Sequence, residues 1–283
     1  MNPRLVGLAV HPVKSTAIRA VASAEVEPWG LVDDRRWMVV DGTGECLTAS
    51  EEQRLFAVTA STSSTDPGQQ AALRLSAPGL DPLDVAVPQG DPVAVTVHGR
   101  PLEGVVADGG SSAWLRDALG HDGLRLVHVH RARPLNPEHS RPGDATAFAD
   151  AYPVTLASAV SLRRLAEWVA ETAVERGEEP DAPLPIERFR PNLVVDGDLE
   201  PFEEDGWTAV TVGGTRFRVV KGVDRCVMTT LDPVSLRRGH EPIRTLARHR
   251  KRDGATWFAM QLVPEVGDVR GVVSVGDEVV VER

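Results

Sequence analysis

The sequence predicts an α+β protein that is mainly β, with an N-terminal β-barrel-like domain packed on a second β-rich domain that carries a few helices. Short apolar stretches recur along the chain, with Pro and Gly between them. Many short strands at close spacing are typical of barrels and sandwiches. Few segments have the periodicity or capping of a helix, so a doubly wound sheet is disfavoured. The length of 283 residues exceeds one average domain and favours two.

The N-terminal part consists mostly of strand-like stretches. One of them, Arg36–Val40, ends at the turn signal Asp41-Gly42-Thr43-Gly44 and resumes at Glu45–Thr48, which is the pattern of a hairpin. The other expected strands are Arg4–Val10, Leu55–Ser61, Leu73–Ser76, Leu83–Val87 and Val93–Val97. A short helix is expected over Ser112–Leu119, with serine as the cap and Gly120 as the stop. An alternating strand, Arg125–His130, follows it.

The clearest helix is predicted over Ser158–Arg176. Its apolar residues repeat at helical spacing and form one stripe, namely Leu162, Leu165, Val169 and Ala173. Ser158 or Ser161 is expected to cap this helix, and Gly177 to end it. The expected strands after it are Asn192–Val195, Thr208–Val212, Thr215–Val220, Cys226–Thr230 and Val272–Glu282.

Charge and cysteine content limit the class of protein. The formal net charge of −10 argues against a general binder of nucleic acid or of anionic membranes, because such surfaces attract basic proteins. No apolar segment approaches the roughly 20 residues of a membrane helix, and the N-terminus lacks a signal-peptide pattern. Two cysteines, far apart in the sequence, fit a reducing compartment without disulfides. We therefore expect a cytoplasmic protein.

Cys226 lies in an unusual setting, the stretch GVDRCVMTTLDP. A free cysteine is often a small buried apolar residue. The preceding Arg225 supplies a fixed positive charge, which favours a thiolate, and a thiolate is a nucleophile or a soft metal ligand. The stretch contains no CxxC motif, so a structural zinc site would need histidines from elsewhere. Both the core interpretation and the reactive interpretation remain open from this pattern alone.

Two other patterns suggest ligand contacts. Lys14 and Ser15 follow a strand and would suit a phosphate, although the Gly-rich P-loop pattern is missing. Arg188 and Arg190 would lie on one side of an extended segment before Pro191 and Asn192, and arginine forks beside an amide suit an anionic or hydrogen-bonding ligand. The ordinary alternatives are a solvated loop for the first pattern and a salt-bridged edge strand for the second.

His128 and His130 are two residues apart on a predicted strand. Both side chains would therefore face one side, which permits a metal site. Val127 and Val129 alternate with them, which suits an ordinary half-buried strand equally well.

The motifs together resemble those of the MOSC family, specifically the two-part members that include the mitochondrial amidoxime-reducing component and its bacterial relatives. The similar stretches, in order, are HPVKS, DRRWMVVD, GECLTA, FADAYPVTLASAVSL, RFRPNLVV, DRCVMTTLDP and VSVGDEVVV. They extend over nearly the whole chain. The resemblance implies a MOSC N-terminal β-barrel domain at residues 1–122 and a MOSC domain at residues 123–283.

The resemblance also implies a molybdenum–pterin cofactor of the molybdopterin type. Cys226 would be the single protein thiolate on molybdenum, and the charge of Arg225 would help to keep it ionised. The residues expected to hold the anionic end of the cofactor are Lys14, Ser15 and Arg35. The residues expected to hydrogen-bond the pterin are Ser158, Arg190 and Asn192. Asp150 is expected to orient water or a proton near the metal.

The activity that the resemblance implies is the reduction of an N-hydroxylated or N-oxide small molecule, with oxygen removed at molybdenum. Electrons would come from a separate partner, a ferredoxin-like protein or a flavin-type reductase. An alternative is a molybdenum-cofactor carrier or sulfur-transfer protein that uses a Cys226 persulfide. A third is a binding protein that has lost catalysis. The stretches Leu47–Gln53 and Trp257–Leu262 depart from the family pattern and are expected to line the substrate entrance.

Overall fold

The computed structural model describes residues 2–179, 184–267 and 270–283. The chain divides into two compact units that interleave along the sequence. Unit 1 consists of Met1–Ala9, Ala22–Pro28 and Val154–Arg283, and unit 2 consists of Val10–Val21 and Trp29–Pro153. Twenty-one strands and three α-helices lie in the described residues, which confirms the prediction of a mainly β protein with few helices.

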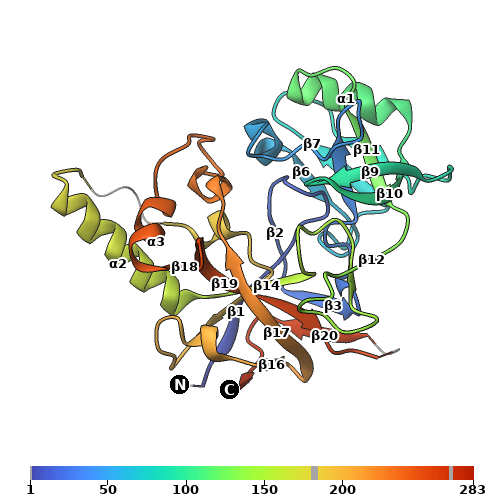
Figure 1. Cartoon of the computed structure of the whole chain (residues 1–283). Coiled ribbons are helices and arrows are strands. Elements are labelled where there is room, and N and C mark those ends of the chain that lie inside the picture. Colours follow the sequence, from blue (N-terminus) through green and yellow to red (C-terminus); the bar gives the residue numbers. More distant parts are fainter. Residues whose placement is uncertain (1, 180–183, 268–269) are drawn as a thin grey trace. The chain divides into compact units, whose positions relative to one another are not determined.

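Unit 1 is built on one large sheet (Figure 1). Its strands follow the order β1-β15-β14-β19-β17-β16-β21, with β18 paired to β19. Their bounds are β1 Arg4–Val10, β14 Val154–Ser158, β15 Leu193–Asp196, β16 Ala209–Val212, β17 Thr215–Asp224, β18 Lys251–Arg252, β19 Ala255–Pro264 and β21 Val279–Glu282. Strands β14 and β15 are parallel, because helix α2 lies between them in the sequence. A second pairing joins β3, Ser23–Glu27, to β20, Gly271–Ser274.

The sheet of unit 1 curls toward closure. Arg4 of β1 forms an antiparallel bridge with Glu278, next to β21. The Leu5 N–H donates to the Asp277 carbonyl at 2.9 Å, and the Val279 N–H donates to the Pro3 carbonyl at 2.9 Å. Strand β1 therefore meets the segment that leads into β21, and barrel-like closure of this kind removes exposed strand edges. This pairing and that of β3 with β20 place early residues in the same unit as the C-terminal half. The predicted division into one domain at residues 1–122 and another at residues 123–283 stays a prediction.

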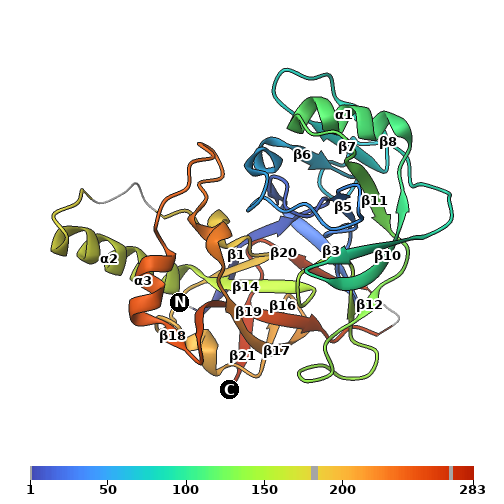
Figure 2. The ribbon, with the colours of Figure 1, turned by 45° about the horizontal axis from the view of Figure 1, so that its top comes forward.

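Helix α2, Ala159–Glu175, confirms the clearest sequence prediction. The Ser158 hydroxyl accepts the Ser161 N–H at 3.3 Å, which is the N-cap bond. Gly177, with φ of +67°, follows the last turn. The buried stripe of α2 packs in a cluster with Phe189, Phe258 and Leu246 of α3, Ile243–His249. Figure 2 shows α2 and α3 lying side by side.

Unit 2 contains three small antiparallel sheets and one helix (Figure 2). The sheet orders are β5-β11-β10-β9, β6-β7-β8 and β12-β13. The bounds are β2 Arg19–Ala20, β4 Gly30–Leu31, β5 Trp37–Val40, β6 Thr59–Ser61, β7 Leu73–Ser76, β8 Leu83–Val85, β9 Val93–Val97, β10 Arg100–Val106, α1 Gly109–Leu119, β11 Arg125–Val129, β12 Arg133–Pro134 and β13 Ala145–Thr146. The Asp41 N–H donates to the Glu45 carbonyl at 2.9 Å, which confirms the predicted turn after β5.

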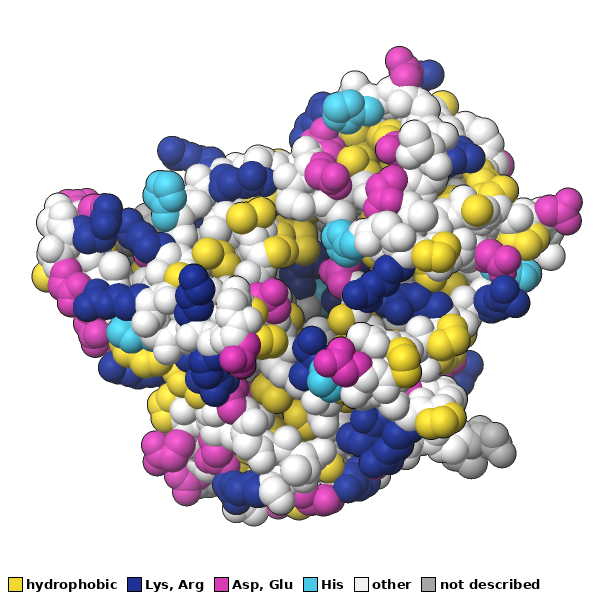
Figure 3. Space-filling view, viewed as in Figure 1, with side chains coloured by type: hydrophobic (Ala, Val, Ile, Leu, Met, Phe, Trp, Pro, Cys, Tyr) yellow, Lys and Arg dark blue, Asp and Glu magenta, His cyan; other side chains and the backbone are white. Residues whose placement is uncertain are grey.

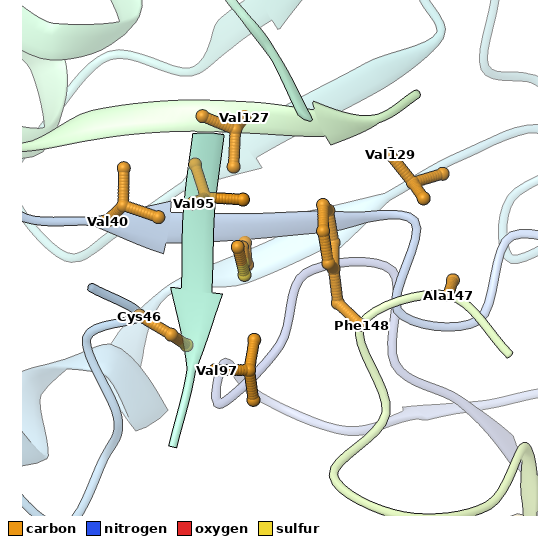
Figure 4. Packing of buried hydrophobic residues seen from close by; sticks show 9 residues of the cluster. Val40, Cys46, Val95, Val97, Val127, Val129, Ala147 and Phe148 are labelled. Carbon is orange, nitrogen blue, oxygen red and sulfur yellow. The ribbon is translucent and has the colours of Figure 1, made fainter. Parts of the chain in front are cut away.

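The core of unit 2 surrounds Phe148 and Cys46 (Figure 4). Valines from β5, β9 and β11 pack around these two side chains. Cys46 is 4% exposed and Phe148 is fully buried. Cys46 is therefore the small buried apolar residue that free cysteine often is.

Four predicted elements differ in the structure. In place of the strand expected over Leu55–Ser61, the 3₁₀ helix η1, Gln53–Ala57, precedes the short strand β6. In place of the strand expected over Val272–Glu282, there are two strands, β20 and β21. Helix α1 begins at Gly109 and not at Ser112, because the Asp108 carboxylate accepts the Ser111 N–H at 3.1 Å and caps the helix earlier. The stretch Cys226–Thr230 is not a strand: β17 ends at Asp224, and the short 3₁₀ helix η4, Val227–Thr230, follows. The hydroxyls of Thr229 and Thr230 donate to the carbonyls of Cys226 and Val227 at 3.0 and 2.7 Å. Such local bonds compete with strand pairing.

No helix of the described residues combines the length and apolar character needed to cross a membrane. On the face drawn in Figure 3, basic and acidic side chains are interspersed. The expectation that the chain does not bind nucleic acid stays a prediction.

Unit 1 also contains a buried acid, Glu204, in the 3₁₀ helix η3, Glu203–Gly206. Its side chain is 1% exposed and accepts the Ser161 hydroxyl at 2.8 Å. Burial raises the pKa of Glu204 from 4.5 to about 7, against the opposing hydrogen bond from Ser161. The folded state therefore binds more protons than the unfolded state between these two pH values, so its stability falls as pH rises through this window.

We predict that Glu204→Gln removes this pH dependence. The difference between 4.5 and about 7 corresponds to about 3 kcal/mol of unfolding free energy. Wild type should lose about this much relative to the variant between pH 4.5 and pH 8, measured by urea unfolding. Glu167→Gln, at an exposed site on α2, is the matched control and should leave the profile unchanged. Parallel profiles for wild type and Glu204→Gln would contradict the assignment.

Candidate functional site

Cys226 is an exposed thiol at the end of β17. The neighbouring backbone is fixed by β19: the Arg225 N–H donates to the Thr256 carbonyl at 2.8 Å, and the Thr256 hydroxyl donates to the Arg225 carbonyl at 3.2 Å. The chain then leaves the sheet, and Cys226 occupies the N-cap position of η4 with extended backbone. The structure therefore favours the reactive interpretation of this cysteine over the core interpretation.

Arg225 fixes the surroundings of the thiol. Its Nε donates to the Phe258 carbonyl at 2.8 Å and its Nη1 to the Phe189 carbonyl at 3.0 Å. Its Nη2 is buried and has no hydrogen-bond partner among residues 2–179, 184–267 and 270–283. Burial lowers the pKa of Arg225 to about 9, although Cys226 and Asp224 oppose the change. The guanidinium still carries its charge at neutral pH, and its Nη2 is free to donate a hydrogen bond to a ligand.

Arg190 and Asn192 follow Phe189, whose carbonyl accepts a hydrogen bond from Arg225. Arg190 is 8% exposed and has a left-handed backbone with φ of 49°, which a non-glycine residue adopts at a cost. The Asn192 side chain accepts the Thr155 N–H at 3.1 Å and donates to the Ala9 carbonyl at 3.1 Å. Asn192 thus joins β1, β14 and β15, in addition to any contact with a ligand.

Ser158 is fully buried, and its hydroxyl serves the N-terminus of α2. This bond gives Ser158 a clear role in the fold of unit 1. Its predicted contact with a pterin stays a prediction.

Gln261 of β19 is a polar residue that the sequence did not single out. Its side chain is 8% exposed, and its Oε1 has no hydrogen-bond partner within the described part of the chain. Gln261 pairs with Lys221 on β17 and with Thr155 on β14, so three polar side chains share one face of the sheet. A buried amide in an otherwise apolar strand, FAMQLV, is the signal that could have revealed it.

The remaining predicted residues lie in unit 2. Lys14 is 4% exposed, and its ammonium forms an ion pair with the Asp150 carboxylate. Arg35 forms an ion pair with Asp34, whose carboxylate also accepts the His11 N–H at 2.8 Å. Ser15 and Arg35 both have left-handed backbones, with φ of 66° and 51°. Strained residues of this kind concentrate at binding sites, so their occurrence here fits the predicted anion contacts.

Asp150 contacts several basic side chains of unit 2. His98 Nε2 lies 3.0 Å from the same carboxylate oxygen that Lys14 contacts. Desolvation by itself would raise the pKa of Asp150, but the Lys14 charge and the bonds from His98 and Lys14 hold it far below its ordinary value. The hydrogen bond to Asp150 raises the pKa of His98 in turn. Asp150 is therefore a carboxylate at neutral pH and has no proton to donate.

The histidine pair is not part of a metal centre in the structure. The His128 ring packs against Trp37, with ring centroids 4.6 Å apart, and burial lowers the pKa of His128. No group of three or more His, Cys, Asp or Glu side chains within the described ranges is close enough to hold a metal ion. The ordinary interpretation of the His128–His130 strand is thus favoured.

Comparison with known families assigns two domains. The description "MOSC N-terminal beta barrel domain" matches residues 2–122, and "MOSC domain" matches residues 143–280. Mitochondrial amidoxime-reducing component 1 of Xenopus laevis is 29% identical over 96% of this chain and 80% of its own. Mitochondrial amidoxime reducing component 2 of Rattus norvegicus is 30% identical over 94% of this chain and 78% of its own.

A second kind of relative is longer. Molybdenum cofactor sulfurase of Danio rerio is 30% identical over 98% of this chain, which spans 34% of the sulfurase. Among solved structures, the YUAD protein from Bacillus subtilis aligns with 99% of this chain and 94% of its own, at 12% identity and a TM-score of 0.43.

We predict that the two cysteines differ strongly in reactivity. Burial raises the pKa of Cys46 to about 12, so only about one Cys46 in ten thousand is a thiolate at pH 8. Cys226 is exposed. Titration of the native protein with a disulfide reagent at pH 8 should modify one thiol per chain rapidly, and two after denaturation. The native Cys226→Ser variant, which keeps only the buried Cys46, should show no rapidly reacting thiol. Two rapidly reacting thiols in native wild type would contradict the structure.

Proposed function

The chain belongs to the MOSC family, in the form that joins a MOSC N-terminal beta barrel domain to a MOSC domain, and on this premise we propose that it is a molybdenum-cofactor oxidoreductase that reduces N-hydroxylated or N-oxide small molecules. Relatives that match nearly the whole chain are named amidoxime-reducing components. The observation that best supports the proposal is the exposed Cys226 thiol beside a buried guanidinium with an unused donor.

The residues present fit a molybdenum–pterin cofactor. Cys226 offers the soft thiolate ligand that such a metal accepts, and the pterin would have to supply further sulfur ligands. Arg225 Nη2 would donate to an acceptor of the pterin, and Gln261 Oε1 would accept from one of its N–H groups, since both are buried without partners in the described ranges. When bound, the cofactor would supply the two-electron chemistry that removes oxygen from an N–O bond.

The residues of unit 2 would bind the anionic end of the cofactor. The Lys14 ammonium and the Arg35 guanidinium are held by Asp150 and Asp34 in this structure, so an arriving phosphate would share or replace these carboxylates. Ser15 would add a hydroxyl from the same loop. Lysine is a point charge and arginine a planar fork, and both suit phosphate oxygens.

We assign Asp150 a positioning role. It keeps the Lys14 ammonium and the His98 ring in place, and its lowered pKa disfavours proton donation. If Asp150 orients water or a proton near the metal, its carboxylate would therefore act as a hydrogen-bond acceptor and not as a proton donor. In unit 1, Arg190 would hydrogen-bond the pterin. Ser158 and Asn192 would hold the surrounding helix and strands in place through the bonds described above. Both would also hydrogen-bond the pterin with their remaining hydrogen-bonding capacity.

The two electrons would come from a separate protein, a ferredoxin-like donor or a flavin-type reductase. The names of the amidoxime-reducing relatives include the word mitochondrial, so the expected cytoplasmic location stays a prediction.

A second candidate function is sulfur transfer through a Cys226 persulfide, suggested by the similarity to a molybdenum cofactor sulfurase. The exposed thiol suits both functions. The chain spans about a third of that relative, so the sulfurase activity itself is not transferred. Mass spectrometry of the intact protein distinguishes the two, since a persulfide adds one sulfur atom at Cys226.

We predict that Cys226→Ser loses molybdenum and activity but keeps its fold. Wild type, expressed with molybdate in cells that make the cofactor, should contain nearly stoichiometric molybdenum and pterin. The variant lacks the soft ligand, so its molybdenum content, measured by elemental analysis, should fall to background. Its reduction of an amidoxime by a chemically reduced dye should fall with it.

Cys46→Ala is the matched control, because Cys46 lies in the core of unit 2; it should retain the metal. Full molybdenum content in Cys226→Ser would refute the ligand role. Bound cofactor without turnover in wild type would instead favour the carrier function.

A further inference from the structure

Two arginines of unit 2 converge on one backbone carbonyl. Arg100, at the start of β10, places its Nη1 3.2 Å from the Asp150 carbonyl oxygen. Arg133, in β12, places its Nη2 3.1 Å from the same oxygen and 2.7 Å from the Ala149 carbonyl. Two guanidinium groups therefore share a neutral acceptor. Such an arrangement is costly unless an anion is nearby, because like charges at close range repel each other.

The charges of this pair are not neutralised by an ion pair. Neither Arg100 nor Arg133 has a carboxylate within salt-bridge distance in residues 2–179, 184–267 and 270–283, whereas the nearby Arg131 pairs with Glu103 at 2.9 Å. The Asp150 carboxylate offsets part of the Arg133 charge, but Lys14 and His98 also contact this one carboxylate, through its Oδ1. Burial and the charge of Arg100 lower the pKa of Arg133. The cluster thus carries excess positive charge in a chain whose net charge is −10.

The two arginines also line a groove. Its volume is about 290 Å³, and its lining residues are Arg100, Pro101, Arg133, Pro134, Leu135 and Asn136. That volume corresponds to roughly ten water molecules, which is more than one phosphate group needs. The prolines and Leu135 give the groove apolar walls, and Asn136 adds an amide at its rim. The groove therefore combines two fixed cations with room for a larger group.

We propose that Arg100 and Arg133 form a phosphoryl-binding subsite that is additional to the predicted anion contacts of Lys14, Ser15 and Arg35. A guanidinium fork matches the oxygens of a phosphoryl group. The two sets of cations meet at Asp150, Lys14 on its carboxylate and the arginines on its carbonyl. A diphosphate would engage both sets at once. Part of the inference rests on the proposed function: one source of such a ligand is a pterin cofactor extended by a nucleotide through a diphosphate. The other source is a free phosphorylated molecule.

A purely structural role makes a different prediction. If the arginines served only to hold the segment at Asp150, their loss would lower thermal stability and leave phosphate affinity unchanged. The experiment must therefore measure both quantities on the same variants.

The test uses the full chain purified from cells that cannot make the cofactor. Calorimetric titration at constant ionic strength compares inorganic phosphate with pyrophosphate. Wild type should bind pyrophosphate about tenfold or more tightly than phosphate, since a charge-assisted bond contributes at least this factor. Arg100→Gln and Arg133→Gln should each lose that preference. Arg131→Gln, a paired arginine two residues before Arg133, is the matched control and should keep it.

The outcomes separate cleanly. Unchanged pyrophosphate affinity in both variants, with or without a lower thermal midpoint, would overturn the subsite, as would absence of binding to wild type at millimolar concentration. The source of the ligand follows from nucleotides released by acid hydrolysis of the cofactor-loaded protein. A nucleoside monophosphate in proportion to molybdenum would identify the extended cofactor. Pterin without nucleotide would exclude that source and leave a free phosphorylated molecule as the ligand of the subsite. Loss of the proposed oxidoreductase function would appear separately, as absence of molybdenum from loaded wild type.

Discussion

The buried guanidinium of Arg225 is the interaction on which the thiol site of unit 1 depends. Two of its nitrogens bond to the carbonyls of Phe189 and Phe258, and it thereby connects the segment before β15 to strand β19. Its backbone is the last link of β17 to β19. The next residue, Cys226, leaves the sheet and is exposed. The position and the charge beside the thiol are therefore set by one side chain, and a lysine could not replace its two directed bonds.

A comparable constraint organises unit 2, but there it is electrostatic. Asp150 provides one carboxylate and one carbonyl to four groups that carry or acquire positive charge. This explains why the acid is held as a carboxylate and why Lys14 tolerates burial, since a buried ammonium needs a partner. The sequence suggested a role near the reacting atoms for Asp150. The contacts describe a residue that holds several basic side chains in place, and the role near the reacting atoms stays a prediction.

The sequence was informative wherever local physics decides the structure. Helix α2 has a capping serine, an apolar stripe and a terminal glycine, so its limits could be predicted. A strand is expected over Cys226–Thr230 because threonine has a high strand propensity. The prediction is wrong because the hydroxyls of Thr229 and Thr230 bond to backbone carbonyls one turn earlier. Contacts between distant residues were not accessible in this way. Lys14 and Asp150 are 136 positions apart, and no periodicity relates Arg100 to Arg133.

The hydrogen-bonding groups of unit 1 limit the chemistry of a ligand more strongly than the positive charge of Arg225 does. Arg225 Nη2 is a donor without an acceptor, and Gln261 Oε1 is an acceptor without a donor, within the described residues. Gln261 lies in β19, and Arg225 directly follows β17, the strand that pairs with β19. An inorganic anion could satisfy the arginine but would repel the amide oxygen. A ligand that satisfies both must present donors and acceptors together, as the rings of a pterin do. A buried polar group without a partner costs about 1–3 kcal/mol, so a ligand that pairs with these groups would stabilise the folded protein.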